Sequence, residues 1–247
     1  MSEVIRRIPK VVVREYDLGA STASPTLTDG EIHVWRQSLE PWSHPVERYR
    51  SVLSPDELQR AGRFRFDRDR NEFLVSRATL RTLLGCYLDI PANQLRFFYS
   101  EYGRPLLPAN DYAEGVDFNV SHSDGMLLLA FTRGRKIGID IEKVRRDFVT
   151  AEIAERFFSA AERLALRELP HEQRHEAFFR CWTRKEAFIK ALGEGLRHPL
   201  DQFDVSLAAG QPPTLLATRP DAGEARRWLL WNVPVPSDYV AALAAEA

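Results

Sequence analysis

The sequence feature that most restricts the fold is a pattern that occurs once in each half of the chain. Residues 75–85 read VSRATLRTLLG and residues 183–193 read TRKEAFIKALG, and both have the periodicity of a helix that ends in Leu-Gly. A proline-bearing connector, a strand-like segment and a turn follow each of them. The pattern predicts two similar α+β halves in a pseudo-twofold arrangement, residues 1–134 and 135–247, with a ligand site at the seam between them.

The composition fits a folded protein and excludes several classes. The 247 residues are 44% hydrophobic, which is too apolar for a disordered chain. A formal net charge of -1 does not give the basic surface of a general nucleic-acid binder. The first residues lack the apolar stretch of a signal peptide, and the longest apolar run, residues 126–131, is too short to span a membrane. We therefore expect a cytoplasmic protein in which Cys86 and Cys181 are reduced core residues.

Turn and capping signals divide the chain into helices and strands. Residues 1–30 end in small polar residues and are expected to form a mobile arm or connector. Ser54-Pro55 marks a helix start, and Ser159 with Glu162 forms the capping box of another helix. Two long helices are expected at 71–88 and 177–193. The expected strands are 31–39, 95–107 with a turn at 102–105, 118–121, 126–131, 136–141, 203–216 and 226–247.

An alternating segment, Gly138-Ile139-Asp140-Ile141-Glu142, places two carboxylates on one face of a strand. Two carboxylates side by side in a half-buried strand repel each other unless a cation lies between them or one is protonated. Oxygen-only ligands of this kind suit Mg²⁺, which bridges to substrate phosphates. On its own, the segment also fits an exposed strand face paired with Arg145 and Arg146.

A second cluster lies in the helix that contains Trp182 and residues 183–190. Glu186 and Lys190 are four residues apart and share a helix face. A third acid with a lysine beside it would complete a metal–phosphate site, in which the acid binds metal or takes a proton and the lysine neutralises an oxyanion. The alternative is an ordinary surface pair worth about 0.3–0.5 kcal/mol.

Two further clusters carry polar donors. Asn119, Ser121 and His122 end a strand, where they offer contacts to a phosphate or simply form a turn. Arginines recur from Arg60 to Arg77, and another follows Gly103; a solvated helix face is the alternative for each of them. The chain has no phosphate-binding P-loop, no dinucleotide-binding glycine motif and no zinc-protease motif, which weakens those three functions.

The order and spacing of these segments resemble one known family. The succession of GRP, FNVSHS, GIDIE, FFSAAE and WTRKEAFIKALGEGL is similar to the 4′-phosphopantetheinyl transferase superfamily. The length and the two halves resemble its larger, monomeric branch, the surfactin-synthetase-activating type. The resemblance runs from about Leu58 to Leu215, and no motif supports it in the first 50 or last 30 residues.

The resemblance implies a role for each matched residue. Asp140, Glu142 and Glu186 match the three magnesium-binding acids, and Glu186 is also the expected base for the attacking hydroxyl. Lys190 matches the lysine that contacts a coenzyme A phosphate, with Lys185 beside it. The remaining coenzyme A contacts implied by the family fall on Arg60, Arg63, Arg104, Asn119, Ser121 and His122.

The reaction implied by the resemblance is phosphoryl transfer. A serine of an apo acyl or peptidyl carrier protein attacks the phosphate of coenzyme A that bears pantetheine, and 3′,5′-ADP leaves. The catalytic residues are then Asp140, Glu186 and Lys190, and the metal is Mg²⁺. Two rival functions stay open: a non-catalytic protein that holds coenzyme A or a carrier, and a magnesium-dependent nucleotide pyrophosphatase with the same acids.

Overall fold

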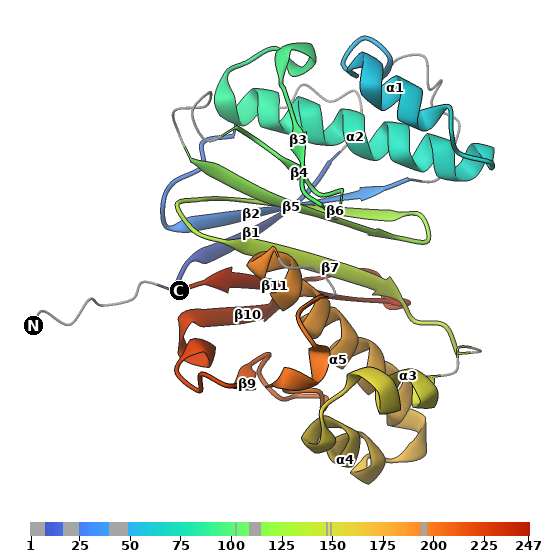
Figure 1. Cartoon of the computed structure of the whole chain (residues 1–247), viewed down its shortest axis with the longest axis vertical. Coiled ribbons are helices and arrows are strands. Elements are labelled where there is room, and N and C mark those ends of the chain that lie inside the picture. The colour runs from blue at the N-terminus through green and yellow to red at the C-terminus, as the bar shows by residue number, and fades with distance from the viewer. Residues whose placement is uncertain are drawn as a thin grey trace, which may run out of the picture.

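Two β-sheets stack face to face, and helices cover the outer face of each, in a computed structural model of the chain (Figure 1). The structure describes residues 8–16, 25–39, 49–101, 103–108, 115–146, 148, 150–193 and 197–247. Tyr102 of the expected turn and half of the expected N-terminal arm, residues 1–7 and 17–24, lie outside these ranges. The arrangement confirms the predicted α+β class with two similar halves.

The N-terminal half, residues 8–133, holds a four-stranded sheet in the order β1-β2-β6-β5. Strand β1 runs parallel to β2, and the other neighbours are antiparallel. A short hairpin, β3 with β4, and a 3-10 turn at Ala92–Gln94 follow the long helix α2. The elements are β1 (Lys10–Glu15), β2 (Glu31–Ser38), α1 (Pro55–Ala61), α2 (Asp67–Leu88), β3 (Phe98–Tyr99), β4 (Pro105–Leu106), β5 (Val116–Ser123) and β6 (Met126–Arg133).

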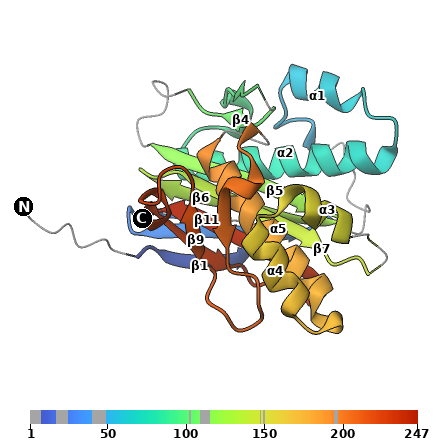
Figure 2. The ribbon, with the colours of Figure 1, turned by 60° about the horizontal axis from the view of Figure 1, so that its bottom comes forward.

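The C-terminal half, residues 137–247, repeats this succession with a three-stranded sheet in the order β10-β11-β7. Helices α3 and α4 lie beside the long helix α5 on the outer face of that sheet (Figure 2). The elements are β7 (Ile137–Lys143), α3 (Thr150–Phe157), α4 (Ala160–Glu168), α5 (His171–Leu192), a 3-10 turn (Leu200–Gln202), β8 (Phe203–Val205), β9 (Leu215–Thr218), β10 (Trp228–Asn232) and β11 (Tyr239–Glu246).

The two halves match in topology, but their register differs from the one in the sequence pattern. Helices α2 and α5 both have 22 residues and begin at Asp67 and His171. The pattern aligned residue 75 with 183, which is four residues, or about one helical turn, out of this register. A helix repeats its faces every turn, so apolar periodicity alone could not distinguish the two alignments.

Several element boundaries also differ from the prediction. Residues 10–15 are not part of an arm, because they form β1 and extend the first sheet beyond β2. Helix α2 begins at Asp67 rather than residue 71, since its first turn is polar and carries no apolar signal. Helix α3, Thr150–Phe157, was not predicted.

Three apolar layers hold the molecule together. One lies between α2 and the first sheet, one between α5 and the second sheet, and one between the two sheets. Ile137, Ile139 and Ile141 of β7 fill the layer between the sheets. The alternate residues of β7 therefore face α5, as the alternation in the sequence predicts. Cys86 and Cys181 are both free; Cys181 is buried, whereas Cys86 is only partly buried.

Gly138 allows α5 to lie directly against β7. A Cβ atom at this position would come within 2.1 Å of the Ala187 carbonyl oxygen and 2.4 Å of the Ala191 nitrogen. The glycine thus brings the helix face that carries Glu186 and Lys190 close to the strand face that carries Asp140. In the described part of the chain, no helix is long and apolar enough to cross a membrane.

Candidate active site

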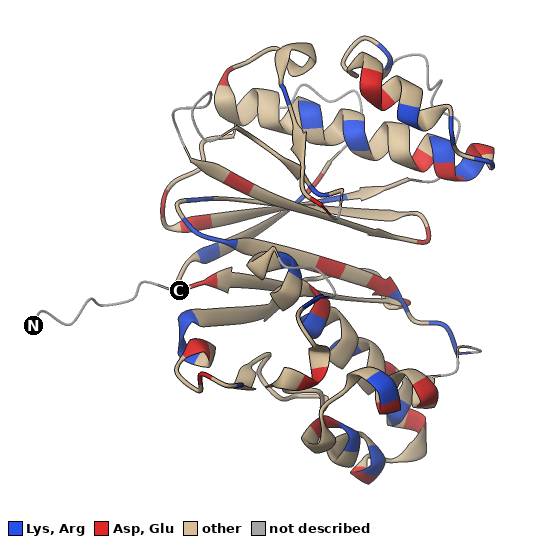
Figure 3. Ribbon diagram, in the orientation of Figure 1, with Lys and Arg blue, Asp and Glu red and all other residues tan. Residues whose placement is uncertain are grey.

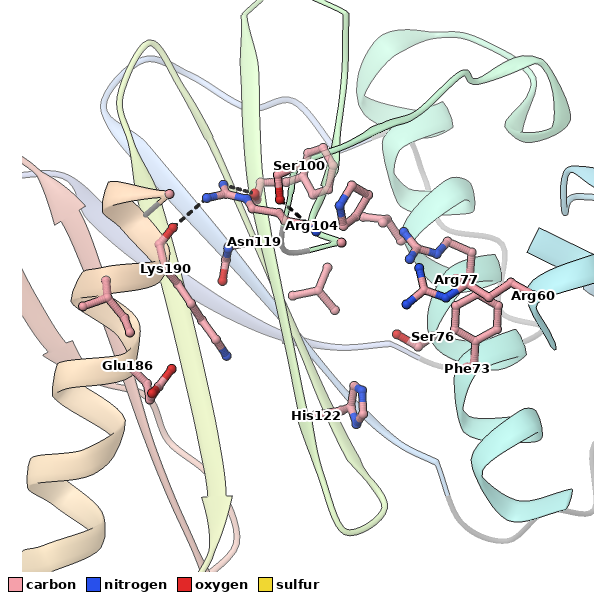
Figure 4. A pocket seen from close by; sticks show the side chains of 17 residues that line it. Arg60, Phe73, Ser76, Arg77, Ser100, Arg104, Asn119, His122, Glu186 and Lys190 are labelled. Atoms are coloured by element: carbon pink, nitrogen blue, oxygen red, sulfur yellow. Dashed lines mark hydrogen bonds between the residues drawn. The ribbon is translucent and has the colours of Figure 1, made fainter. Parts of the chain in front are cut away.

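A cavity of about 460 Å³ lies at the seam between α2, the hairpin β3–β4, strand β5 and α5 (Figure 4). Its walls come from both halves of the chain. Figure 3 shows basic segments along α2 and acidic segments on β7, on the two sides of this seam. The lining includes Arg60, Phe73, Ser76, Arg77, Gly103, Arg104, Phe118, Asn119, Val120, His122, Glu186, Ile189 and Lys190.

Asp140 is buried beside the cavity and forms an ion pair with Lys190. Its Oδ1 accepts hydrogen bonds from Lys190 Nζ at 2.6 Å and from Ser121 Oγ at 2.9 Å. Its Oδ2 is buried and has no hydrogen-bond partner. Burial raises the pKa of Asp140, and the ammonium of Lys190 opposes that shift. The unsatisfied oxygen is a free ligand position beside the cavity.

A row of polar side chains on β5 joins the two sheets and orients the acids. Asn119 Oδ1, Ser121 Oγ and Ser123 Oγ accept the backbone N–H groups of residues 139, 141 and 143 at 3.0, 3.3 and 3.2 Å. Ser121 and Ser123 then donate to the carboxylates of Asp140 and Glu142, at 2.9 and 3.0 Å. These side chains therefore replace the missing backbone pairing between β5 and β7, besides fixing two carboxylates.

Glu142 and Glu186 are held near Asp140. The pKa of Glu142 is raised by burial and by the charge of Asp140, while its bonds to Ser123 and Trp182 lower it. Burial, with the charges of Asp140 and Glu142, raises the pKa of Glu186 to about 7, and Lys190 opposes this rise. The three predicted acids thus act on one another electrostatically. In the described residues, however, no three His, Cys, Asp or Glu side chains are arranged to hold a metal ion.

Lys190 sits at the centre of this group. Its Nζ donates to both Ser121 and Asp140, and the residue lines the cavity. Figure 4 shows its side chain and that of Glu186 on the same face of α5, on one side of the cavity. The predicted i, i+4 pair is therefore correct, and its lysine contacts an acid of the neighbouring strand.

Arg104 connects the two halves across the cavity. Its Nη1 donates to the Lys190 carbonyl at 2.6 Å, near the end of α5, and its Nη2 donates to the Phe118 carbonyl at 2.9 Å. Its Nε is buried without a partner. Burial lowers the pKa of Arg104, and Asp117 opposes this. Arg104 reaches the predicted site, but two of its three nitrogens bind the protein itself.

The predicted basic contacts separate into two groups. Arg60 and His122 line the cavity. Arg63 lines an adjoining hollow of about 530 Å³, which Arg60 also borders together with Tyr99. Burial and the charge of Lys190 lower the pKa of the His122 imidazole, while Glu72 raises it.

Comparisons with known proteins agree with this geometry. The family model "4'-phosphopantetheinyl transferase, N-terminal" matches residues 35–133, and that of the 4′-phosphopantetheinyl transferase superfamily matches residues 136–244. The 4′-phosphopantetheinyl transferase HetI of Nostoc sp. is 37% identical over 219 residues, 89% of each chain. The chain belongs to this superfamily.

Other transferases of the superfamily align less completely. Sfp of Bacillus subtilis is 35% identical over 161 residues, which are 65% of this chain and 69% of Sfp. The human L-aminoadipate-semialdehyde dehydrogenase-phosphopantetheinyl transferase is 31% identical over 225 residues, 85% of this chain and 71% of the human one. The predicted family, its Sfp-like branch and the enzyme class of 4′-phosphopantetheinyl transferase are confirmed.

One predicted contact of the transferase with its substrate is wrong. Lys185 is fully buried on the face of α5 away from the cavity. Its Nζ is paired with Glu162 at 2.8 Å and donates to two backbone carbonyls, those of Leu200 and Phe203. Adjacent helix residues point about 100° apart, and here Lys185 points toward the chain that follows α5 while Glu186 lines the cavity.

The sequence analysis gave no role in the site to Arg77, Trp182 or Ser123. Arg77 lines the cavity of the transferase, and Trp182 and Ser123 both hold Glu142. The signal for Ser123 was present, because Asn119, Ser121 and Ser123 alternate along one strand face. Arg77 gave a weaker signal, an arginine that interrupts the apolar face of a helix.

Proposed function

We propose that this transferase binds coenzyme A in the seam cavity and moves its phosphopantetheine group to a serine of an apo carrier protein, in a magnesium-dependent reaction. The observation that carries the proposal is the convergence of Asp140, Glu186 and Lys190 on one end of a cavity whose other end is lined by arginines. We further propose that the chain acts as a monomer in the cytoplasm, without nucleic acid.

The acids at this end suit a magnesium ion in three respects. The donors are all carboxylate oxygens, Asp140 Oδ2 is buried without a partner, and burial with mutual repulsion raises the pKa values of Glu142 and Glu186. Asp140, Glu142 and Glu186 would hold the ion, and their side chains would have to turn toward it, because in this structure the described acids are not arranged around a common point. Bound Mg²⁺ would neutralise charge on the diphosphate as its P–O bond breaks.

Lys190 and Glu186 would handle the remaining charge and the proton. The Lys190 ammonium lies 2.6 Å from Asp140 and lines the cavity, where it can pair with a phosphate oxygen. The carboxylate of Glu186, on the same helix face, can accept the proton of the serine hydroxyl as that oxygen attacks. The serine oxygen forms a bond to phosphorus, and the 3′,5′-ADP oxygen leaves with the electron pair.

A surface next to Glu142 suits the carrier protein. A hollow of about 220 Å³ begins at Glu142 and has an apolar floor. Phe148, which is 41% exposed, lies in its wall, and Lys143 and Arg145 border it. An apolar side chain and the acidic helix that a carrier presents beside its serine would meet this surface, which is continuous with the acids that act on the diphosphate.

Incubation with coenzyme A, Mg²⁺ and a panel of apo carrier proteins tests the function. Intact mass should show the addition of one phosphopantetheine group to a carrier, and a chelator should prevent it. Asp140→Ala should abolish the transfer while the circular dichroism spectrum stays that of the wild type. A chelator-resistant, fully active Asp140 variant would contradict the proposal.

The same assay separates the rival functions. A protein that only holds coenzyme A would bind it without any change in carrier mass. A pyrophosphatase would release 4′-phosphopantetheine in the absence of a carrier. Either result would show that the protein has the corresponding rival function and not the proposed transferase activity.

A further inference from the structure

One peptide connection joins the two halves, and it lies at one end of the seam. Strand β6 ends at Arg133, opposite Val116 at the start of β5, and residues 134–136 lead from there into β7. Successive side chains of β5 bond to successively later residues of β7, so the two strands run parallel and away from this connection. Asp140 and Glu142 lie toward the far end of β7, where the connection does not hold the strands together.

A cluster of ion pairs occupies that far end. Asp124 follows Ser123 at the tip of the β5–β6 hairpin, and its Oδ1 accepts from Arg68 Nη2 of α2 at 2.7 Å. Its Oδ2 is paired with Lys143 Nζ of β7 at 2.9 Å. Its carbonyl accepts from Tyr239 Oη of β11 at 2.8 Å. One residue is thus bound to a helix of the N-terminal half and to two strands of the C-terminal half.

The tip of the hairpin is a two-residue turn that suits an acid. Asp124 and Gly125 both have positive φ values, 43° and 90°. Besides Gly, Asp and Asn are the residues that adopt this conformation most readily, and Asp-Gly is typical of such a turn. An Asn in place of Asp124 would therefore keep the turn and lose only the charge.

The cluster is continuous with the bonds that hold Glu142. Ser123, next to Asp124 in the chain, donates to the Glu142 carboxylate at 3.0 Å and accepts the backbone N–H of Lys143 at 3.2 Å. Lys143, next to Glu142, carries the ammonium that binds Asp124. Two adjacent residues of one half thus bond to two adjacent residues of the other, and separation of Asp124 from Lys143 would draw Ser123 away from Glu142.

The arrangement differs from an ordinary surface ion pair. A single exposed pair contributes little to stability. The side chain of Asp124 is only 24% exposed, and its two oxygens bind two cations that come from different halves of the chain. Its effect is therefore expected on the relative position of the two halves at this end of the seam.

We propose that Asp124 is a positioning residue, which closes the far end of the seam and thereby holds Glu142 in place for the reaction. Asp124 does not line the cavity, so it acts through Ser123 and Lys143. The catalytic part of this inference rests on the proposed function, because it takes Glu142 as a ligand of the magnesium ion.

Amide hydrogen exchange, followed residue by residue by NMR, tests the closure without substrate or metal. In Asp124→Asn the Lys143 amide, which bonds to β5 at the far end, should exchange about fivefold faster. The Ile141 amide should show a smaller increase. The Ile139 amide, bonded to β5 nearer the peptide connection, should exchange as in the wild type.

The magnesium dependence of carrier modification gives the second readout. Asp124→Asn should raise the Mg²⁺ concentration for half-maximal rate by about 10-fold, the lower end of the effect of residues that support a metal ligand. The KM for coenzyme A at saturating Mg²⁺ should stay within about twofold, because Asp124 does not line the cavity.

Arg68 provides a test from the other half of the chain, at a distance from the surface assigned to the carrier, which Lys143 borders. Arg68→Gln should change amide exchange and Mg²⁺ dependence in the same direction as the Asp124 variant, and Arg68→Lys should restore both. Arg70→Gln is the matched control, since this arginine belongs to the same helix and pairs with Asp67 of that helix. It should leave both readouts unchanged.

The outcomes separate the two proposals. Unchanged exchange at Lys143 in Asp124→Asn would overturn the closure, and equally faster exchange at Ile139 would show that Asp124 only supports the fold. Faster exchange at Lys143 with an unchanged Mg²⁺ dependence would overturn the role in holding Glu142. Wild-type protein that modifies no carrier would instead refute the proposed function, and the exchange data would still decide whether Asp124 closes the seam.

Discussion

The two halves of the molecule share one scaffold, but the strand faces that look onto their long helices differ completely. On β2 this face carries His33, Trp35 and Gln37, and on β7 it carries Gly138, Asp140 and Glu142. The N-terminal face is closed by neutral bonds, since Tyr87 Oη lies 2.8 Å from both His33 Nδ1 and Trp35 Nε1. The C-terminal face keeps charged groups in contact with a cavity.

The difference shows how little of the scaffold carries the chemistry. Both halves contain the same succession of a strand, helices, a short hairpin and two further strands. In the N-terminal half these elements enclose an inert polar core, and in the C-terminal half they enclose an acidic site. Glycine at one position of β7 brings α5 close enough for Lys190 to reach Asp140. Whether a side chain of α2 or α5 takes part in the site therefore depends on whether its helix face borders the seam.

The largest expected effect concerns the position that differs most between the long helices. Glu186 of α5 corresponds to Thr82 of α2, whose hydroxyl bonds back to the Ala78 carbonyl and also contacts the Tyr16 hydroxyl. Glu186→Gln should lower kcat by about 10²–10⁴-fold, because a positioned base is lost. Thr82→Ala should keep kcat within about twofold, since that face carries no charge. Steady-state carrier modification measures both, and a similar loss in the two variants would show that the halves share the chemistry.

Lys185 of α5, whose counterpart in α2 is the buried Arg81, provides the next test. Lys185→Met leaves Glu162 buried without its cation, so the free energy of unfolding should fall by about 3–5 kcal/mol. The KM for coenzyme A of the folded protein should not change, because Lys185 lies away from the cavity. Urea unfolding and carrier modification give the two values. A raised KM with unchanged stability would restore Lys185 as a substrate contact.

Gly138 tests how the C-terminal half brings helix and strand together. Gly138→Ala places a methyl group 2.1 Å from the Ala187 carbonyl, so α5 must shift. We expect a loss of about 1–3 kcal/mol in unfolding free energy and a lower kcat, because Glu186 and Lys190 move with the helix. Gly30→Ala is the control, since a Cβ there meets nothing within 4 Å. An unaffected kcat would mean that the close approach is not needed for the chemistry.

The sequence predicted which strand and helix faces carry the acidic side chains, because those signals are local and periodic. Alternation along GIDIE placed Asp140 and Glu142 on one face, and helical spacing placed Glu186 with Lys190. That these two faces meet follows from Gly138, whose role became visible only when α5 was placed against β7.

The features that the sequence did not predict depend on contacts between residues that are far apart in the chain. Lys185 looked equivalent to Lys190 until the burial of its helix face was known. Arg104 was expected to bind substrate, and its carbonyl partners lie 86 and 14 residues away along the chain. Strand β1 was missed because its pairing with β2 joins two segments separated by a polar stretch.

The smallest expected effect returns to the closed face of β2. Burial, followed by the charge of Arg14, lowers the pKa of His33, while Glu31 partly offsets the shift. The unfolded chain, with a histidine pKa of 6.5, then binds more protons than the folded one, so stability should be full above that pH and fall below it. His33→Asn should flatten this part of the pH dependence of urea unfolding. An unchanged slope would mean that other groups cause the loss of stability at low pH. His33 itself has no counterpart on β7, because Gly138 occupies the matching place there.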